Sequence, residues 1–260
     1  MKRTVTQILA ILIFAVFFVS CDDDNEDLQK TGKNGQPIGI TYDNTNVYFY
    51  YQGSKLSRIK EVGGSVSDFR YENNELVSIL FFQDNKEDLE GLVFTDFTKE
   101  GSHKIIIRSG EALSSYAPPP WELELDENNI PLKIIDGKYY AIFTYDSDNK
   151  NLIKQTLYDI STEKIVTTYN YEYDSNFGIL SKVDLPLWFY AYKAYSARES
   201  RYTYNRIYFN YYNNLIKETI SNENGSKYDE FNYDYWYNDW HAPVLMSGDT
   251  PGRISLSITY

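Results

Sequence analysis

The chain has 260 residues and a formal net charge of −12 at neutral pH, with 37 acidic against 25 basic side chains. This acidic balance makes nucleic acid a poor partner, because phosphate binding needs a basic face, and it equally disfavours charge-driven adhesion to anionic lipid. The single cysteine excludes a disulfide within the chain, and the spacing of the two histidines, His103 and His241, fits no zinc motif, so we expect no metal and no cofactor.

The first 20 residues predict a secretory signal peptide. A basic start precedes an apolar run from Ile8 to Val19, which is shorter than the roughly 20 residues that a membrane-spanning helix needs. The residues at 18–21, Phe-Val-Ser-Cys, resemble a lipobox with phenylalanine in place of the more usual leucine. We therefore expect cleavage before Cys21 and acylation of this cysteine, which would anchor the chain to a membrane. The alternative is an ordinary signal peptide followed by a free thiol.

An acidic segment follows the cysteine. Asp22, Asp23 and Asp24 come directly after it, in a stretch with no aromatic and almost no aliphatic side chain. Such a composition cannot bury enough apolar surface to fold, so we expect residues 21–37 to be a flexible tether in front of a single all-β domain at 38–260. The three aspartates resemble the surface-export signal of Bacteroidota lipoproteins, which predicts an outer-membrane protein exposed at the cell surface. The alternative interpretation is that the acidic residues form only a solvated linker, because such a linker has the same composition.

One sequence motif, which we call the phrase, recurs across the rest of the chain. It consists of aromatic-x-Tyr, then residues rich in Asp and Asn, then an apolar segment with lysine. Alternation puts one set of rings on one face of a strand, and Asp, Asn and Gly then turn the chain because they tolerate a left-handed backbone. Each phrase predicts a β-hairpin that needs its neighbours to bury its apolar face. The copies begin at Tyr48, Phe69, Phe143, Tyr171, Phe209 and Phe231, with a weaker relative at Leu123.

We predict an all-β fold, a large antiparallel meander of consecutive hairpins that is either a curved open sheet or barrel-like, because short polar turns leave no room for crossovers. Tyr71, Tyr145, Tyr173 and Tyr211 should then occupy equivalent positions near strand ends. Tyrosine outnumbers phenylalanine 26 to 14, and since a buried phenol needs a partner, this favours a sheet whose faces are partly wet. The one candidate helix lies within 185–200, where an aromatic loop fits as well.

The recurring phrase resembles the YD repeat of large bacterial shell proteins. Together with the leader and the acidic tether, it resembles a family of Bacteroidota lipoproteins of unknown function with a porin-like fold. The resemblance spans about residues 40–260 and rests on the aromatic-x-Tyr-Asp phrases and on the returns at 129–132 and 241–244, while the segments 85–120 and 184–207 depart from the pattern. The resemblance implies a curved antiparallel meander that is water-soluble although its overall shape is porin-like. It implies no activity.

Three aromatic clusters supply the candidate binding residues. Trp121 follows three prolines, Trp188 and Tyr190 follow a single proline, and Trp236 and Trp240 flank an Asn-Asp pair. Flat rings stack on the apolar faces of sugars while Asn and Asp bond the hydroxyls, and proline stiffens the backbone that presents the rings. The alternative is that these rings close the ends of the sheet as core.

No catalytic residue can be nominated from the sequence. A Gly-x-Ser-x-Gly elbow is absent, and with so many acids some pair always lies at the spacing of a glycosidase. The segment 146–151 starts like a calcium loop, but Lys150 occupies a ligand position, so we expect a hairpin turn. The residues at 254–260 alternate like the last strand of an outer-membrane barrel. Charged side chains interrupt many expected strands, however, so the outward apolar band of such a barrel is not expected.

Three functions fit these observations. The first is a surface-tethered, non-enzymatic lipoprotein that binds a ligand, in particular a glycan, or a surface protein. The second is a structural or assembly lipoprotein without a small ligand, and the third is a glycan-cleaving enzyme. A cleft with a tryptophan and two facing carboxylates would favour the enzyme. An exposed aromatic platform without such carboxylates would favour the binder, and the absence of any exposed aromatic cluster would favour the structural protein.

Overall fold

The computed structural model describes residues 35–83, 91–148, 150–198, 203–249 and 255–260. The predicted signal peptide, Cys21 and the aspartates at 22–24 lie outside these residues, so the anchor and the export signal stay predictions. Gln36 and Pro37, which the sequence assigns to the tether, are buried.

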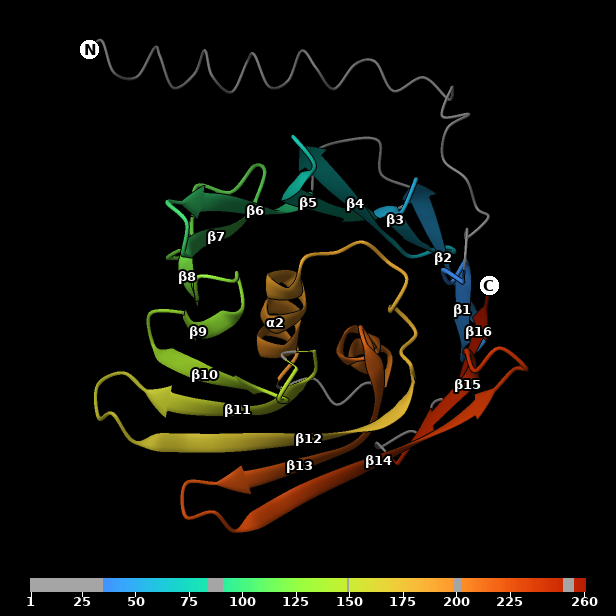
Figure 1. Cartoon of the computed structure of the whole chain (residues 1–260). Helices are drawn as coiled ribbons and strands as arrows, with labels where there is room; N and C mark the ends of the chain where they lie inside the picture. Colours follow the sequence, from blue (N-terminus) through green and yellow to red (C-terminus); the bar gives the residue numbers. More distant parts are fainter. Residues whose placement is uncertain (1–34, 84–90, 149, 199–202, 250–254) are drawn as a thin grey trace.

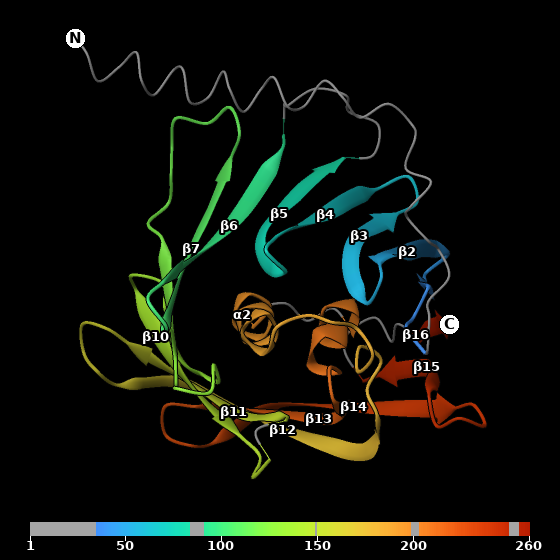
Figure 2. The same cartoon turned by 45° about the horizontal axis from the view of Figure 1, so that its top comes forward.

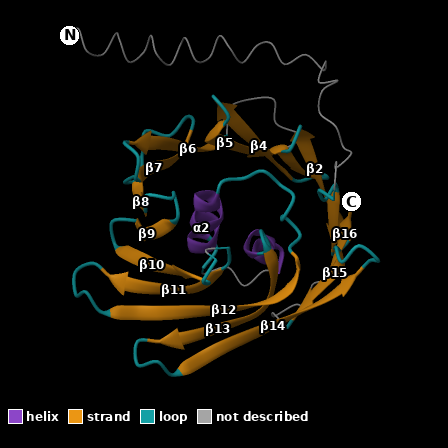
Figure 3. Cartoon of the chain, viewed as in Figure 1, coloured by secondary structure: helices purple, strands orange, loops and turns teal. Residues whose placement is uncertain are grey.

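The described strands form a closed antiparallel barrel in which every strand pairs with its neighbours in sequence (Figures 1 and 3). The predicted meander of consecutive hairpins is confirmed, and the sheet is closed rather than open. The strands are β1 (Gly39–Tyr42), β2 (Thr45–Gln52), β3 (Lys55–Glu61), β4 (Ser65–Glu72), β5 (Glu75–Gln83), β6 (Val93–Glu100), β7 (Lys104–Glu111), β8 (Trp121–Leu125), β9 (Pro131–Ile135), β10 (Tyr139–Tyr145), β11 (Leu152–Asp159), β12 (Ile165–Phe177), β13 (Asn213–Asn222), β14 (Lys227–Tyr237), β15 (Pro243–Gly248) and β16 (Ser255–Thr259). Helix α2 (Leu187–Ser196) and the 3₁₀-helix η1 (Thr203–Phe209) lie between β12 and β13.

The last strand closes the barrel onto the first. Ile40 of β1 pairs with Ile258 of β16, and the backbone amide of Ile38 donates to the carbonyl of Thr259 at 2.7 Å. This pairing leaves neither terminal strand with an open edge, which removes the template that an unpaired strand offers to other chains.

The barrel has two different ends. Turns after odd-numbered strands gather at one end, which we call the far end. Turns after even-numbered strands gather at the other, which we call the insertion end because the segment 178–212 leaves the wall there. The short turns carry the residue types that the sequence predicts: Asp43 and Asn44 after β1, and Asn73 and Asn74 after β4, all have positive φ.

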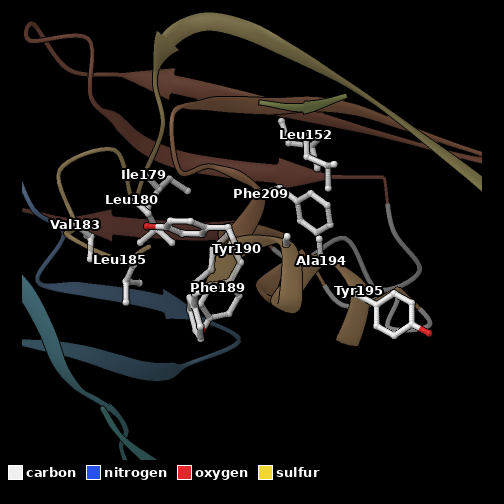
Figure 4. Packing of buried hydrophobic residues seen from close by; sticks show 14 of the residues in the cluster. Leu152, Ile179, Leu180, Val183, Leu185, Phe189, Tyr190, Ala194, Tyr195 and Phe209 are labelled. Carbon is white, nitrogen blue, oxygen red and sulfur yellow. The ribbon is translucent and has the colours of Figure 1, made fainter. Parts of the chain in front are cut away.

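The insertion fills the barrel, since Figures 1 and 2 both show α2 and η1 inside the ring of strands. The helix begins after Pro186, whose φ of −68° suits helix entry, so the helical interpretation of this segment is correct. Phe189, Ala194 and Tyr195 are buried against the inner wall (Figure 4). A helix enclosed by a sheet must be apolar on most sides, which explains why this aromatic segment departs from the repeat. No helix in the described ranges has the length and hydrophobicity of a membrane-spanning segment.

A buried ion pair fixes η1 inside the barrel. Arg206 donates from Nε to Glu218 Oε2 at 2.8 Å and from Nη2 to Oε1 at 3.2 Å, and its Nη1 donates to the carbonyl of Ala197 at 3.1 Å. The hydroxyl of Tyr233 donates to the same carboxylate at 3.3 Å. Burial raises the pKa of Glu218, and the guanidinium of Arg206 offsets this rise only in part. The pair therefore holds two elements together without a large net gain in free energy.

The outer face of the described wall carries charged pairs. Arg58 and Asp68 form an ion pair at 2.5 Å across β3 and β4, and Lys104 and Glu122 form one at 2.9 Å across β7 and β8. The buried apolar side chains of the wall instead contact α2 and η1 inside the barrel.

Three repeated tyrosine contacts explain the recurring phrase. Each acceptor carbonyl is followed in its own strand by one extra residue, which shifts the register against the preceding strand at Tyr51, Tyr145 and Tyr173. Such a β-bulge takes main-chain groups out of the ladder, and a phenol from the next even-numbered strand supplies the donor. We call these contacts the tyrosine latches: Tyr71 to the Leu56 carbonyl at 2.9 Å, Tyr173 to that of Leu152 at 2.9 Å, and Tyr235 to that of Leu215 at 2.8 Å.

The latches correct two expectations. Tyr71, Tyr145 and Tyr173 do lie near the ends of their strands at the insertion end, but Tyr211 lies between η1 and β13 and not in the wall, because its phrase belongs to the insertion. The expectation that buried phenols have partners holds for only some tyrosines of the inner face. Tyr51 is buried and donates to the carbonyl of Pro37 at 2.6 Å, whereas the buried hydroxyls of Tyr145 and Tyr171 have no hydrogen-bond partner in the described part of the chain.

Candidate functional site

A pocket of about 400 Å³ opens at the insertion end of the barrel. Its walls come from β3 to β7, from the β8–β9 turn and from the segment that leads into α2. The repeat brings these parts together, because the turns after β4 and β8 reach the same end of the barrel as the start of the insertion.

The inner part of the pocket is apolar. Leu76, Phe97 and Ile105 are buried side chains that line it. The half-buried indole of Trp188 borders the same space, with its ring centre 4.9 Å from that of Phe97. Trp188 is in the first turn of α2, so Pro186 fixes its position through the start of the helix.

One side of the pocket's rim is cationic. The Nζ of Lys55 donates to the carbonyl and to the side-chain oxygen of Asn74, at 2.6 and 3.2 Å, and it lies 4.9 Å from the ring centre of Tyr71. Burial, helped by the nearby charge of Asp184, raises the pKa of the Tyr71 phenol. The phenol therefore keeps its proton and its latch to Leu56, which gives Lys55 a fixed support.

The opposite side of the rim consists of amides. The β8–β9 turn places Asn128 and Asn129 at the pocket. The carboxylate of Asp126 holds this turn, because its Oδ1 accepts hydrogen bonds from the amides of Asn128 and Ile130, both at 2.8 Å. An asparagine amide can donate and accept at the same time, so these side chains suit a ligand rich in hydroxyl groups.

Two carboxylates complete the rim. Glu75 forms an ion pair with Lys99 at 3.7 Å and is 65% exposed. The exposed Asp184 accepts a hydrogen bond from the hydroxyl of Ser54 at 3.3 Å. The general acid of a glycosidase is typically a carboxyl group in an apolar environment that raises its pKa, and neither of these side chains is buried. The arrangement therefore suits hydrogen bonding better than bond cleavage.

The structure places the predicted binding residues in different environments. Trp188 lines the pocket. Trp121 is half-buried inside the barrel, with its ring centre 5.3 Å from that of Tyr195. Tyr190 is 4% exposed and stacks on Tyr211 at 4.5 Å. Trp121 and Tyr190 thus belong to the core, which is the alternative that the sequence left open.

The remaining two predicted residues are exposed and lie away from the pocket lining. Trp236 is on β14, and Trp240 is 81% exposed in the β14–β15 turn. The side chain of Asn238 holds this turn, because its Oδ1 accepts hydrogen bonds from the amides of Trp240 and Ala242, both at 3.0 Å. The five predicted residues therefore do not form one platform.

Sequence reasoning missed the polar half of the pocket. Lys55, Asn74, Asn128 and Asn129 belong to hairpin phrases, and the sequence predicts only a turn at each of them. The signal that could have found them is their shared place in the phrase, because antiparallel neighbours return every such turn to the same end of the sheet. Only the curvature of the closed wall then brings turns from different hairpins to one opening.

The other groups that the sequence singles out have structural roles. The exposed His103 contacts the carbonyl of Asp126 through Nδ1 at 3.1 Å, and His241 is in the β14–β15 turn. In the segment 146–151 the Oδ1 of Asp146 accepts a hydrogen bond from the amide of Lys150 at 2.8 Å, as a hairpin turn requires. Across the described ranges, no group of three or more His, Cys, Asp and Glu could hold a metal ion.

Comparisons with known proteins add a likeness of fold. No protein-family model matches the chain, and no curated protein matches it. A porin-like protein from Bacteroides vulgatus has a similar solved structure, with 14% identity, a TM-score of 0.43, and coverage of 86% of this chain and 98% of that one. Another, from Bacteroides uniformis, has 8% identity, a TM-score of 0.35, and coverage of 83% and 76%. Both of these proteins are porin-like.

Proposed function

We propose that this protein is a lipid-anchored, non-enzymatic binding protein that holds a glycan in the pocket at the insertion end. The observation that carries this proposal is the position of Trp188, whose indole borders a pocket with amides and charges on its rim. The volume of the pocket lies within the range of about 300–1,000 Å³ typical of small-molecule sites. An apolar inner wall with a few polar groups at the opening is also the usual composition of such sites.

The chemistry of the pocket favours a saccharide among small ligands. A sugar ring has an apolar face of C–H groups that can stack on the indole of Trp188, and hydroxyl groups around its edge that both donate and accept. Asn128 and Asn129 offer both roles at one side of the rim, Lys55 offers donors at the other, and Asp184 offers an acceptor. A rim of mixed charge matches a neutral or weakly charged ligand better than a strongly anionic one.

A second candidate function is glycan cleavage, because Glu75 and Asp184 both line the pocket beside Trp188. Hydrolysis of a bound glycan that is lost in Glu75→Gln and Asp184→Asn would favour this function over simple binding. A structural or assembly role without a small ligand, which the sequence places ahead of cleavage, would be favoured if no glycan binds.

The change Trp188→Ala should weaken glycan binding at least tenfold, or about 1.4 kcal/mol, because it removes the ring on which the sugar stacks. Binding can be screened on a glycan array and then measured by titration calorimetry. The matched control is Trp121→Ala, which removes the same ring from a position that also packs on α2 but does not line the pocket. Equal loss in both variants would show that the effect comes from a disturbed helix and would count against the proposed site.

The change Cys21→Ala should move the protein from the membrane fraction to the soluble fraction, because acylation of this cysteine supplies the anchor. Fractionation of cells followed by immunoblotting measures this. The control is Ser20→Ala, which keeps a small residue before the cleavage point and should stay in the membrane fraction. Retention of Cys21→Ala in the membrane would contradict the anchor. In this proposal Asp22, Asp23 and Asp24 then direct the anchored protein to the cell surface.

A further inference from the structure

The chain enters the barrel at the insertion end. Gln36 donates from Nε2 to the carbonyl of Ser54 in the β2–β3 turn at 3.0 Å, and Tyr51, near the end of β2, donates to the carbonyl of Pro37. Gly35 lies beside Lys182 of the insertion, since a Cβ on this glycine would be 3.7 Å from that side chain. Gly35, the first described residue, therefore lies at the end where the pocket opens.

The segment between the predicted anchor and the barrel is short. Cys21 and Gly35 are 14 positions apart, and a flexible chain of that length, as its composition predicts, spans about 20 Å on average and about 50 Å at full extension. The wall beside the entry point is formed by β2, whose 8 residues span about 26 Å. To bring the far end to the membrane, the segment would have to run along this wall and extend beyond its average length. Its average length instead keeps the insertion end next to the anchor.

Exposed rings stand at that end. Phe177 ends β12, Tyr212 precedes β13, and Trp240 is in the β14–β15 turn; all three are exposed. We call them the aromatic rim. Lysines lie over two of these rings, with Lys182 Nζ 4.7 Å from the ring centre of Phe177 and Lys150 Nζ 4.8 Å from that of Tyr212. Amphipathic rings with lysines nearby are typical of surfaces at the boundary between water and lipid.

Exposure alone does not select this end, because Tyr116 is 72% exposed in the β7–β8 connection at the far end. The place where the chain enters is the feature that distinguishes the two ends. Since the side chain of Lys182 lies beside Gly35 and over the ring of Phe177, the entry point and the aromatic rim are next to each other.

We infer that the insertion end faces the membrane that holds the anchor, and that the aromatic rim contacts its lipid headgroups. This inference rests on the proposed anchor at Cys21. The contact depends on rings and not on charge, because the chain is acidic overall, so it does not require anionic lipid. The pocket then opens toward the bilayer surface.

The test couples the thiol of Cys21 in the mature chain, which starts at that residue, to a maleimide lipid in vesicles of phosphatidylcholine. The readout is quenching of tryptophan fluorescence by brominated acyl chains. Quenching is first compared between the unchanged chain and the Trp240→Phe variant. The difference between the two is the contribution of Trp240, which reports on the insertion end. A double variant, Tyr116→Trp with Trp240→Phe, reports the far end against the same background of the other tryptophans.

We expect the contribution of Trp240 to be quenched at least twice as strongly as that of the tryptophan introduced by Tyr116→Trp. Equal quenching at the two ends, stronger quenching at the far end, or none at either would overturn the inference. Because the coupling is chemical, the result does not depend on acylation in the cell. A failed orientation is therefore distinguishable from a failed anchor, which the fractionation of Cys21→Ala tests by itself.

Discussion

Arg206→Met should lower the free energy of unfolding by about 3–5 kcal/mol, because it leaves the carboxylate of Glu218 buried without its counter-charge. Both side chains are at most 2% exposed, so water cannot replace the guanidinium. Urea denaturation followed by tryptophan fluorescence measures the change. The double variant Arg206→Met with Glu218→Met should recover most of the loss, because an apolar pair of similar volume costs no desolvation of charge.

A pair on the outer face provides the control for this prediction. Arg58→Met breaks the ion pair with Asp68, whose partners are 32% and 25% exposed, and should cost no more than about 1 kcal/mol, because water solvates the remaining aspartate. If Arg206→Met costs as little as Arg58→Met, the interior around η1 is hydrated, and the account of the insertion as part of a dry core is wrong.

Removal of the three latch hydroxyls together, in Tyr71→Phe with Tyr173→Phe and Tyr235→Phe, should cost about 3 kcal/mol. Each change leaves a leucine carbonyl without its donor at about 1 kcal/mol, and the three latches use different acceptors and strands, so their effects should add. The shape of the core is preserved because phenylalanine keeps the ring. Thermal and urea unfolding of the single and triple variants measure the sum.

Tyr145 supplies the matched control, since its phenol is buried in the same kind of position but its hydroxyl has no hydrogen-bond partner in the described part of the chain. Tyr145→Phe should therefore leave the stability unchanged or raise it slightly, because it removes a polar group that burial leaves unsatisfied. A loss equal to that of Tyr173→Phe would show that the hydrogen bond is not what stabilises the latches.

Much of the wall can be predicted from the sequence, because the information is local. The phrase at Phe69 or at Phe143 specifies a strand, a turn and a return strand within about 15 residues, and short turns force neighbours to pair. Closure between Ile40 and Ile258 could not be predicted in the same way. Closure depends on the accumulated twist and curvature of the whole sheet, and these cannot be inferred from any single pair of residues.

The candidate site shows the same limit at the level of side chains. The sequence identifies Trp188 as a ring next to a proline, but Tyr190, two residues later, has the same neighbourhood in sequence and is buried on the other side of α2. Which ring reaches the pocket depends on how the helix is turned inside the barrel. The buried contacts of Tyr195 and Arg206 fix this rotation, and their partners, Asp136 and Glu218, lie in other parts of the chain.

The pairing of β1 with β16 has a consequence for the order of folding. The hydrogen bonds that join Ile38 and Ile40 to the final strand cannot form until the last residues of the chain are available. In a chain that emerges from its N-terminus, β1 can pair with β2 early, but its other edge stays open until β16 is available. Contacts between residues as far apart in sequence as those of β1 and β16 form slowly. The sheet therefore remains open until the last strand has paired with the first. Completion of the barrel is then a single late event that encloses the helices.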